Sequence, residues 1–123
     1  LVFGSDVIID ATDSIESRQV IDQISKELNI PMIYGGIYRF EGQVSVFNVN
    51  GSPGYAELFP DKPLGGVACE DAGVVSMLPG IIGNIQALET LKLIVGTEPT
   101  LIGKILIYDG MNHKMEKIQL WLK

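Results

Sequence analysis

Cysteine is nearly absent from this chain, which has a single one, Cys69, in 123 residues. One thiol excludes an internal disulfide, and it leaves neither a four-cysteine zinc site nor a Cys-x-x-Cys pair. This usage is typical of a reducing compartment, so we expect a cytoplasmic protein.

Basic residues are also scarce, with nine lysines and arginines against fifteen aspartates and glutamates. The formal net charge is −6 and the pI about 4.6. An acidic chain binds polyanions poorly, so we expect neither a nucleic acid nor a membrane partner. No apolar run approaches the roughly 20 residues that span a bilayer, and residues 1–4 do not resemble a signal peptide.

A glycine-rich phosphate-binding loop is missing as well. Gly35-Gly36 has neither the spacing of such a loop nor a helix after it. This argues against a complete nucleotide-using enzyme within residues 1–123. Since the first ten residues already lead into a strand, we expect a single partial domain, the carboxyl-terminal part of a longer polypeptide.

The most informative segment is residues 7–18, where the apolar run Val7–Ile9 ends in Asp10 and Asp13 and turns at once into a helical pattern. A strand followed directly by a helix places these acids at the carboxyl edge of a parallel sheet, where open α/β sheets bind ligands. Asp13 is therefore a candidate metal or nucleotide contact. The alternative is a helix cap, with Glu16 completing a capping box.

Strand and helix patterns alternate along the rest of the chain. Strand, helix and strand in this order predict a right-handed parallel crossover, and the last two strands predict a terminal antiparallel hairpin at the sheet edge. The predicted fold class is thus α/β, the later part of a Rossmann-like doubly wound sheet. The predicted strands are 7–10, 31–36, 43–49, 104–109 and 116–122, the helices 14–29 and 79–95, and residues 50–73 an irregular crossover loop.

Side-chain assignments follow from these patterns. In the first helix Val20, Ile21, Ile24 and Leu28 share the predicted buried face, and Arg18 is interpreted as a surface ion pair. Cys69 is either a nucleophile on the crossover loop or, as for most lone cysteines, a small buried residue. His113 falls in the hairpin turn and receives no role.

Several segments together resemble the ThiF/MoeB/HesA family, the bacterial relatives of ubiquitin-activating enzymes. The match follows the family order over nearly the whole chain. The segments are Asp10–Ser14 with Arg18, Ile30-Pro31 with Gly35–Val44, Cys69–Val74, Pro79–Leu93, Gly103-Lys104 and Tyr108-Asp109.

The resemblance implies an enzyme that uses ATP and Mg²⁺ to adenylate the C-terminal glycine of a ubiquitin-like sulfur-carrier protein, as in thiamine or molybdopterin biosynthesis. It implies that Asp13 binds Mg²⁺, that Asp13 and Ser14 contact the nucleotide, and that Cys69 forms a covalent link or handles sulfur. Ser14 stands where asparagine is usual. A homodimer formed through apolar surface is also implied.

Two departures from the family pattern stand out. Many relatives bind zinc through one cysteine pair at the position of Gly54–Glu57 and a second near the C-terminus, and neither is present, so we expect no zinc. The nucleotide-binding half is missing, so the chain alone should not adenylate anything. Two alternatives are a non-catalytic scaffold or subunit for a ubiquitin-like carrier, and the tail of a dinucleotide-binding oxidoreductase domain. The Cys69 loop and the Gln86–Glu89 segment count against the second.

Overall fold

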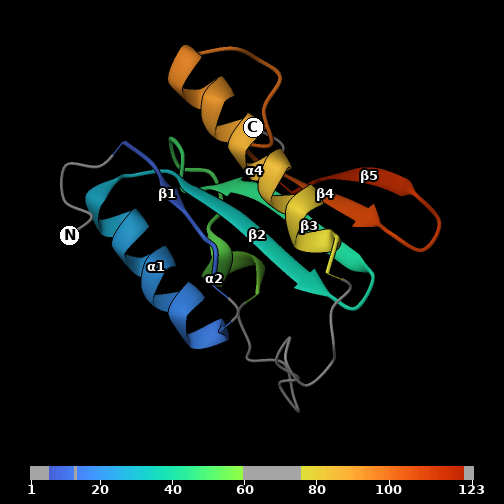
Figure 1. Ribbon diagram of the computed structural model, residues 1–123. Coiled ribbons are helices and arrows are strands. Elements are labelled where there is room, and N and C mark those ends of the chain that lie inside the picture. The colour runs from blue at the N-terminus through green and yellow to red at the C-terminus, as the bar shows by residue number, and fades with distance from the viewer. Residues whose placement is uncertain (1–5, 13, 60–75, 121–123) are drawn as a thin grey trace.

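A computed structural model describes residues 6–12, 14–59 and 76–120 (Figure 1). It contains one five-stranded sheet in the order β1-β2-β3-β4-β5. The elements along the chain are β1 (Ile8–Ile9), α1 (Ile15–Leu28), β2 (Met32–Tyr38), β3 (Glu41–Phe47), α2 (Tyr55–Leu58), α4 (Leu78–Val95), β4 (Lys104–Asp109) and β5 (Lys114–Gln119).

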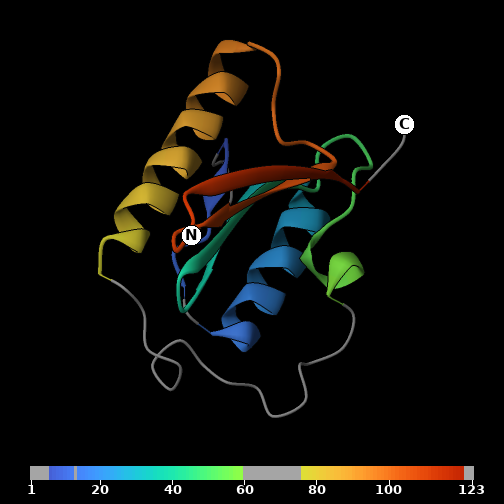
Figure 2. The ribbon, with the colours of Figure 1, turned by 90° about the vertical axis from the view of Figure 1, so that its right-hand side faces the viewer.

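Helices cover both faces of the sheet. Figure 2 shows α4 on one face and α1 with α2 on the other. Side chains that alternate along each strand feed two separate cores, because successive residues of a strand point to opposite faces. The core under α4 is built from Ile33, Val44, Val46, Leu101, Leu106 and Tyr108 with Leu78 and Ile82, and the core on the opposite face from Met32, Tyr34, Phe47 and Ile105 with Tyr55.

Only the first pair of strands is parallel. β1 pairs with β2 in parallel, with Ile8 opposite Met32, and the other three pairs are antiparallel. The predicted parallel pairing across α1 is therefore confirmed, as is the terminal antiparallel hairpin with β5 at the edge. The turn between β2 and β3 contains Arg39, whose φ is 55°.

The amino-terminal cap of α1 differs from the prediction. The N-cap is Ser14, whose side chain accepts a hydrogen bond from the Ser17 backbone N–H at 3.2 Å. The capping box of Asp13 and Glu16 is therefore wrong by one residue, because the helix begins at Ile15. The predicted stop is confirmed, since Asn29 adopts the left-handed conformation at φ 54° that ends helices.

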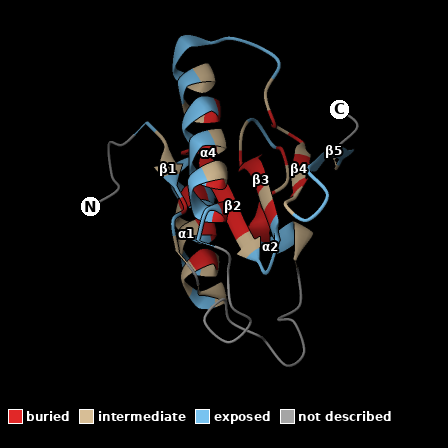
Figure 3. Cartoon of the chain, turned by 45° about the vertical axis from the view of Figure 1, so that its right-hand side comes forward, coloured by how far each residue is buried: buried red, intermediate tan, exposed pale blue. Residues whose placement is uncertain are grey.

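The most buried residues of α1 are polar, and the predicted apolar face is buried only in part: Ile21 packs against the core on this side of the sheet and Ile24 is half-buried. The buried residues of α1 are Arg18, Asp22 and Ser25, whereas Val20 is 56% exposed and Leu28 is exposed as well. The polar side faces inward because its side chains form hydrogen bonds with buried backbone groups. Arg18 donates to the carbonyls of Thr12 and Gly35, and Asp22 accepts from the first N–H groups of α2. Figure 3 shows how burial is concentrated in β2 and β3.

Helix α4 is only partly buried. Leu78 and Ile82 pack into the core and Gly96 ends the helix as predicted, but Gln86 and Glu89 are buried too. The outer side of the helix exposes Leu88, Leu91, Ile94 and Val95. By length and composition alone α4 would suffice to cross a membrane; in the structure it packs on β2 and β3.

Candidate functional site where β1 ends

Asp10 organises the chain where β1 ends. Its backbone N–H extends the parallel ladder to Ile33 O at 2.9 Å, and its side chain is almost completely buried. Its Oδ1 accepts from the backbone N–H of Thr12 at 3.0 Å and from the Thr12 hydroxyl at 2.7 Å. The carboxylate thus folds residues 10–12 into a fixed turn leading toward α1.

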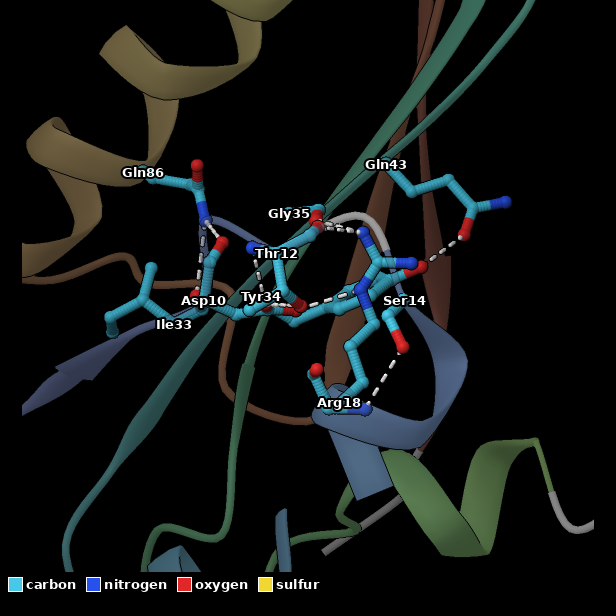
Figure 4. A network of polar contacts seen from close by, with 10 residues as sticks. Asp10, Thr12, Ser14, Arg18, Ile33, Tyr34, Gly35, Gln43 and Gln86 are labelled. Carbon is cyan, nitrogen blue, oxygen red and sulfur yellow. Dashed lines mark hydrogen bonds and ion pairs between the residues drawn. The ribbon is translucent and has the colours of Figure 1, made fainter. Parts of the chain in front are cut away.

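Arg18 holds this turn from the α1 side (Figure 4). Its Nε donates to Asp10 Oδ2 at 2.9 Å, and its Nη2 donates to Thr12 O at 2.8 Å and to Gly35 O at 3.0 Å. The planar guanidinium can serve all three acceptors at once, whereas a lysine ammonium has no such fork. The residue is only 9% exposed, so the predicted surface ion pair is in fact a buried one.

The guanidinium of Arg18 stays charged in this setting. Burial lowers its pKa, but the Asp10 carboxylate, with smaller contributions from Tyr34 and Tyr55, outweighs burial and leaves the pKa above its ordinary value. The guanidinium also lies 5.4 Å from the centre of the Tyr34 ring, within the range of a cation–π interaction. A permanent positive charge therefore lies beside the turn at Asp10–Thr12.

Gln86 contacts the same region, where β1 ends beside β2, from the opposite face of the sheet. Its Nε2 reaches down from α4 and donates to Asp10 O at 2.9 Å and to Ile33 O at 3.1 Å (Figure 4). Gly35 makes room for it, since a Cβ at that position would lie 2.5 Å from the Gln86 amide. Sequence reasoning missed this role, although a glutamine at the buried helical spacing of Leu78 and Ile82 was a usable signal.

Aromatic residues form the wall of the site beside α2. The Tyr34 ring stacks on Phe47 at 5.2 Å and lies 5.5 Å from Tyr55 and 6.0 Å from Phe59. Burial raises the pKa of Tyr55, although the nearby Arg18 works in the other direction. The Tyr34 hydroxyl donates to Gln43 at 3.2 Å, which ties the wall to β3.

The structure describes only some of the residues singled out in the sequence. Asp13 and Cys69 lie outside the described residues. Ser14 is described and caps α1. His113 is exposed in the hairpin turn as predicted, and its Nδ1 lies 2.9 Å from the Tyr108 hydroxyl.

The Asp10 carboxylate has no oxygen free for a metal ion. Both oxygens of Asp10 are already engaged by Thr12 and Arg18. Asp13 is therefore the remaining carboxylate of the Asp10–Ser14 segment, and Mg²⁺ is commonly held by one or two carboxylates together with substrate phosphates. Within residues 6–12, 14–59 and 76–120 no group of three His, Cys, Asp or Glu side chains forms a further metal site.

A scan against protein-family models matches the ThiF family over residues 1–123. The chain belongs to the ThiF family. This confirms the resemblance seen in the sequence, and it argues against the oxidoreductase alternative. ThiF-family membership covers the whole chain, including the segments that the structure does not describe.

Among curated relatives, a probable molybdopterin-synthase adenylyltransferase of Pyropia yezoensis is 38% identical over 118 residues, covering 94% of this chain and 31% of the relative. The SAMP-activating enzyme E1 of Haloferax volcanii is 38% identical over 120 residues, covering 96% of this chain and 44% of the relative. The chain therefore spans less than half the length of these relatives.

Solved structures of low sequence identity share the fold. Escherichia coli MccB, crystallised with MccA, superposes with a TM-score of 0.74 at 13% identity, covering 96% of this chain and 37% of MccB. PaaA superposes with a TM-score of 0.72 at 21% identity, covering 98% of this chain and 44% of PaaA. The predicted α/β fold class is thereby confirmed.

Proposed function

We propose that this ThiF-family chain is the carboxyl-terminal part of an ATP-dependent adenylyltransferase that activates the C-terminal glycine of a ubiquitin-like sulfur carrier. Adenylyltransferases among the relatives, including a molybdopterin-synthase adenylyltransferase and a SAMP-activating enzyme, support the reaction class. The observation that carries the proposal is the turn at Asp10–Thr12, which is held from both faces by Arg18 and Gln86 and leads directly into Asp13.

The chemistry fits an acid at this strand end. The carrier's carboxylate is a poor electrophile until its oxygen attacks the α-phosphate of ATP, displaces pyrophosphate and becomes an acyl-adenylate. Mg²⁺ bound to the phosphates offsets the negative charge that otherwise repels this attack. We assign Asp13 to hold that ion and Ser14 to contact the nucleotide, while Arg18 and Gln86 keep the segment that carries them in place.

The remaining nucleotide-binding groups belong, in this proposal, to the rest of the whole protein. In the described residues β1 pairs with β2 alone, and Ile9 on β1 is 47% exposed. Val20 on the neighbouring α1 is exposed as well. A parallel strand with one open edge beside exposed apolar side chains is suited to a sheet that continues past β1, since parallel sheets are normally buried on both faces.

We further propose that the whole protein is a cytoplasmic homodimer. The exposed apolar strip on the outer side of α4, Leu88, Leu91, Ile94 and Val95, supports a protein partner there. Sedimentation of the whole protein tests this assignment. A monomer that stays monomeric at high concentration would contradict it.

Carrier-dependent exchange between ATP and pyrophosphate, measured with the whole protein, tests the adenylation proposal. Loss of a metal ligand removes several kcal/mol of charge stabilisation, so Asp13→Ala should slow exchange by about two to three orders of magnitude. Glu16→Ala, which changes an acid on the first turn of α1, is the matched control and should leave exchange intact.

Two results would overturn the proposal. Unchanged exchange in Asp13→Ala would refute the metal role. Wild-type protein that binds a sulfur carrier without any exchange would instead support the non-catalytic subunit.

A further inference from the structure

A second buried polar cluster lies away from the candidate site, between α1 and α2. Asp22 of α1 is 2% exposed and directs its carboxylate at the start of α2. Its Oδ1 accepts from the Tyr55 N–H at 2.8 Å, and its Oδ2 accepts from the Ala56 N–H at 3.1 Å. These first-turn donors have no partner inside their own helix, so a side chain of another helix caps α2.

Asn48 completes this cluster from the end of β3. Its Nδ2 donates to Asp22 Oδ1 at 2.9 Å and to the Ser25 hydroxyl at 3.0 Å. Ser25 in turn donates to the carbonyl of Ile30. Asn48 is 7% exposed and adopts φ 62°, a left-handed conformation that asparagine tolerates better than most residues.

Gly54, just before α2, is the close-packed point of the cluster. A Cβ there would lie 2.3 Å from Asn48 Oδ1 and 2.6 Å from Asp22 Oδ1. Any larger residue must therefore push these two side chains apart. A separate link, the ion pair between Lys26 and Glu57 at 2.9 Å, is exposed and contributes little by comparison.

We propose that Asp22 and Asn48 are the residues that position α2, and with it the start of the crossover segment 50–73, without a metal ion. The proposal rests on the contacts above and is independent of the adenylation chemistry. Gly54 offers no ligand atom, and the Glu57 carboxylate is engaged by Lys26 and by the Gly54 N–H at 3.2 Å. The first turn of α2 is thus held by a buried carboxylate.

The placement of α2 also shapes the candidate site. The backbone N–H of Tyr55 donates to Asp22, and the Tyr55 ring belongs to the aromatic wall, where it lies 5.5 Å from the Tyr34 ring. Tyr34 in turn faces the Arg18 guanidinium. Asp22 therefore acts as a positioning residue for that wall, through Tyr55, and touches none of the proposed reacting groups.

Amide hydrogen exchange on the whole protein tests the proposal directly. In Asp22→Asn, the new side-chain NH₂ cannot accept a hydrogen bond from the backbone N–H that it faces. The Tyr55 and Ala56 amides should therefore exchange about 10- to 100-fold faster, as expected when hydrogen bonds to a charged group are lost. Amides of the β2–β3 hairpin should keep their rates. Lys26→Met, which removes the exposed ion pair, is the matched control and should change the rates less than about fivefold.

A second pair of variants covers the case in which Asp22→Asn fails to fold. Gly54→Ala should accelerate the same two amides, whereas Gly83→Ala, whose Cβ would meet no atom within 4 Å, should not. A zinc chelator should leave the wild-type rates unchanged. Unchanged rates in both Asp22→Asn and Gly54→Ala, or a chelator that alone releases α2, would overturn the proposal.

Discussion

Arg18 and Gln86 donate hydrogen bonds from opposite faces of the sheet to the place where β1 ends beside β2. Arg18 donates to Gly35 O from the α1 side, and Gln86 donates to Asp10 O and Ile33 O from the α4 side. Side-chain donors thus supplement the parallel pairing at the point where β1 ends beside β2, because Ile33 O also accepts the Asp10 backbone N–H. The start of the segment that leads to Asp13 is therefore fixed by buried polar groups.

Breaking the buried ion pair should cost far more stability than breaking an exposed one. Arg18→Met leaves the Asp10 carboxylate buried and unpaired, so the free energy of unfolding should fall by about 3–5 kcal/mol. Lys26→Met removes an exposed ion pair with Glu57 and should cost about 1 kcal/mol or less. Urea denaturation of the two variants measures the difference. Equal losses would show that Arg18 is not the buried partner described.

Gly35 and Gln86 should show non-additive effects on stability. Gly35→Ala places a Cβ 2.5 Å from the Gln86 amide and should cost about 1–3 kcal/mol. Gln86→Ala removes the side-chain donor of the Asp10 carbonyl, whereas the Ile33 carbonyl keeps the Asp10 N–H, at a cost of about 1–3 kcal/mol. In the double variant the shorter side chain also removes the clash with the new Cβ. The loss in unfolding free energy of the double variant should therefore be smaller than the sum of the two single losses by about 0.5–3 kcal/mol. Simple additivity in the double-mutant cycle would refute the contact.

Tyr55 should link stability to alkaline pH. Its pKa is raised by burial, so the fold favours the neutral phenol. This contribution is fully present below the unfolded tyrosine pKa of about 10, and it is lost as the pH rises through the higher folded value. Tyr55→Phe should lose less stability above that pH than the wild type. Tyr38→Phe, at an exposed position, is the control and should follow the wild type.

Cys69 should act after adenylation if it acts at all. In the whole protein, Cys69→Ala should spare carrier-dependent pyrophosphate exchange, because a thiol takes no part in forming the acyl-adenylate. Later sulfur transfer to the carrier should fall by about tenfold or more, since the covalent route is lost. Sulfur transfer at the wild-type rate would assign Cys69 a structural role only.

Local pattern was enough to predict most of the fold. Short apolar runs, alternation and helical spacing located the five strands and both long helices of the described residues, and the strand–helix–strand order predicted the parallel pair. Helix α2 was missed, because one turn of four residues within a glycine- and proline-rich segment produces no measurable periodicity. Its aromatic residues were the only local signal.

The interior of the candidate site was beyond prediction. Apolar periodicity in α1 identified Val20 and Leu28 as one face, but it carries no information about which face meets the sheet. Arg18 and Gln86 are buried where they donate to the carbonyls of Gly35 and Asp10, which lie 17 and 76 residues away in the sequence. These contacts form only when the sheet assembles, so no local sequence pattern predicts them.

The two borders of the sheet are protected unequally. β5 carries Lys114 and Lys117, and lysines on a border strand discourage pairing with stray chains. β1 consists of Ile8 and Ile9, with no charge to repel a neighbour. Produced by itself, this polypeptide should self-associate through the open edge of β1. The substitution Ile9→Lys should keep it monomeric.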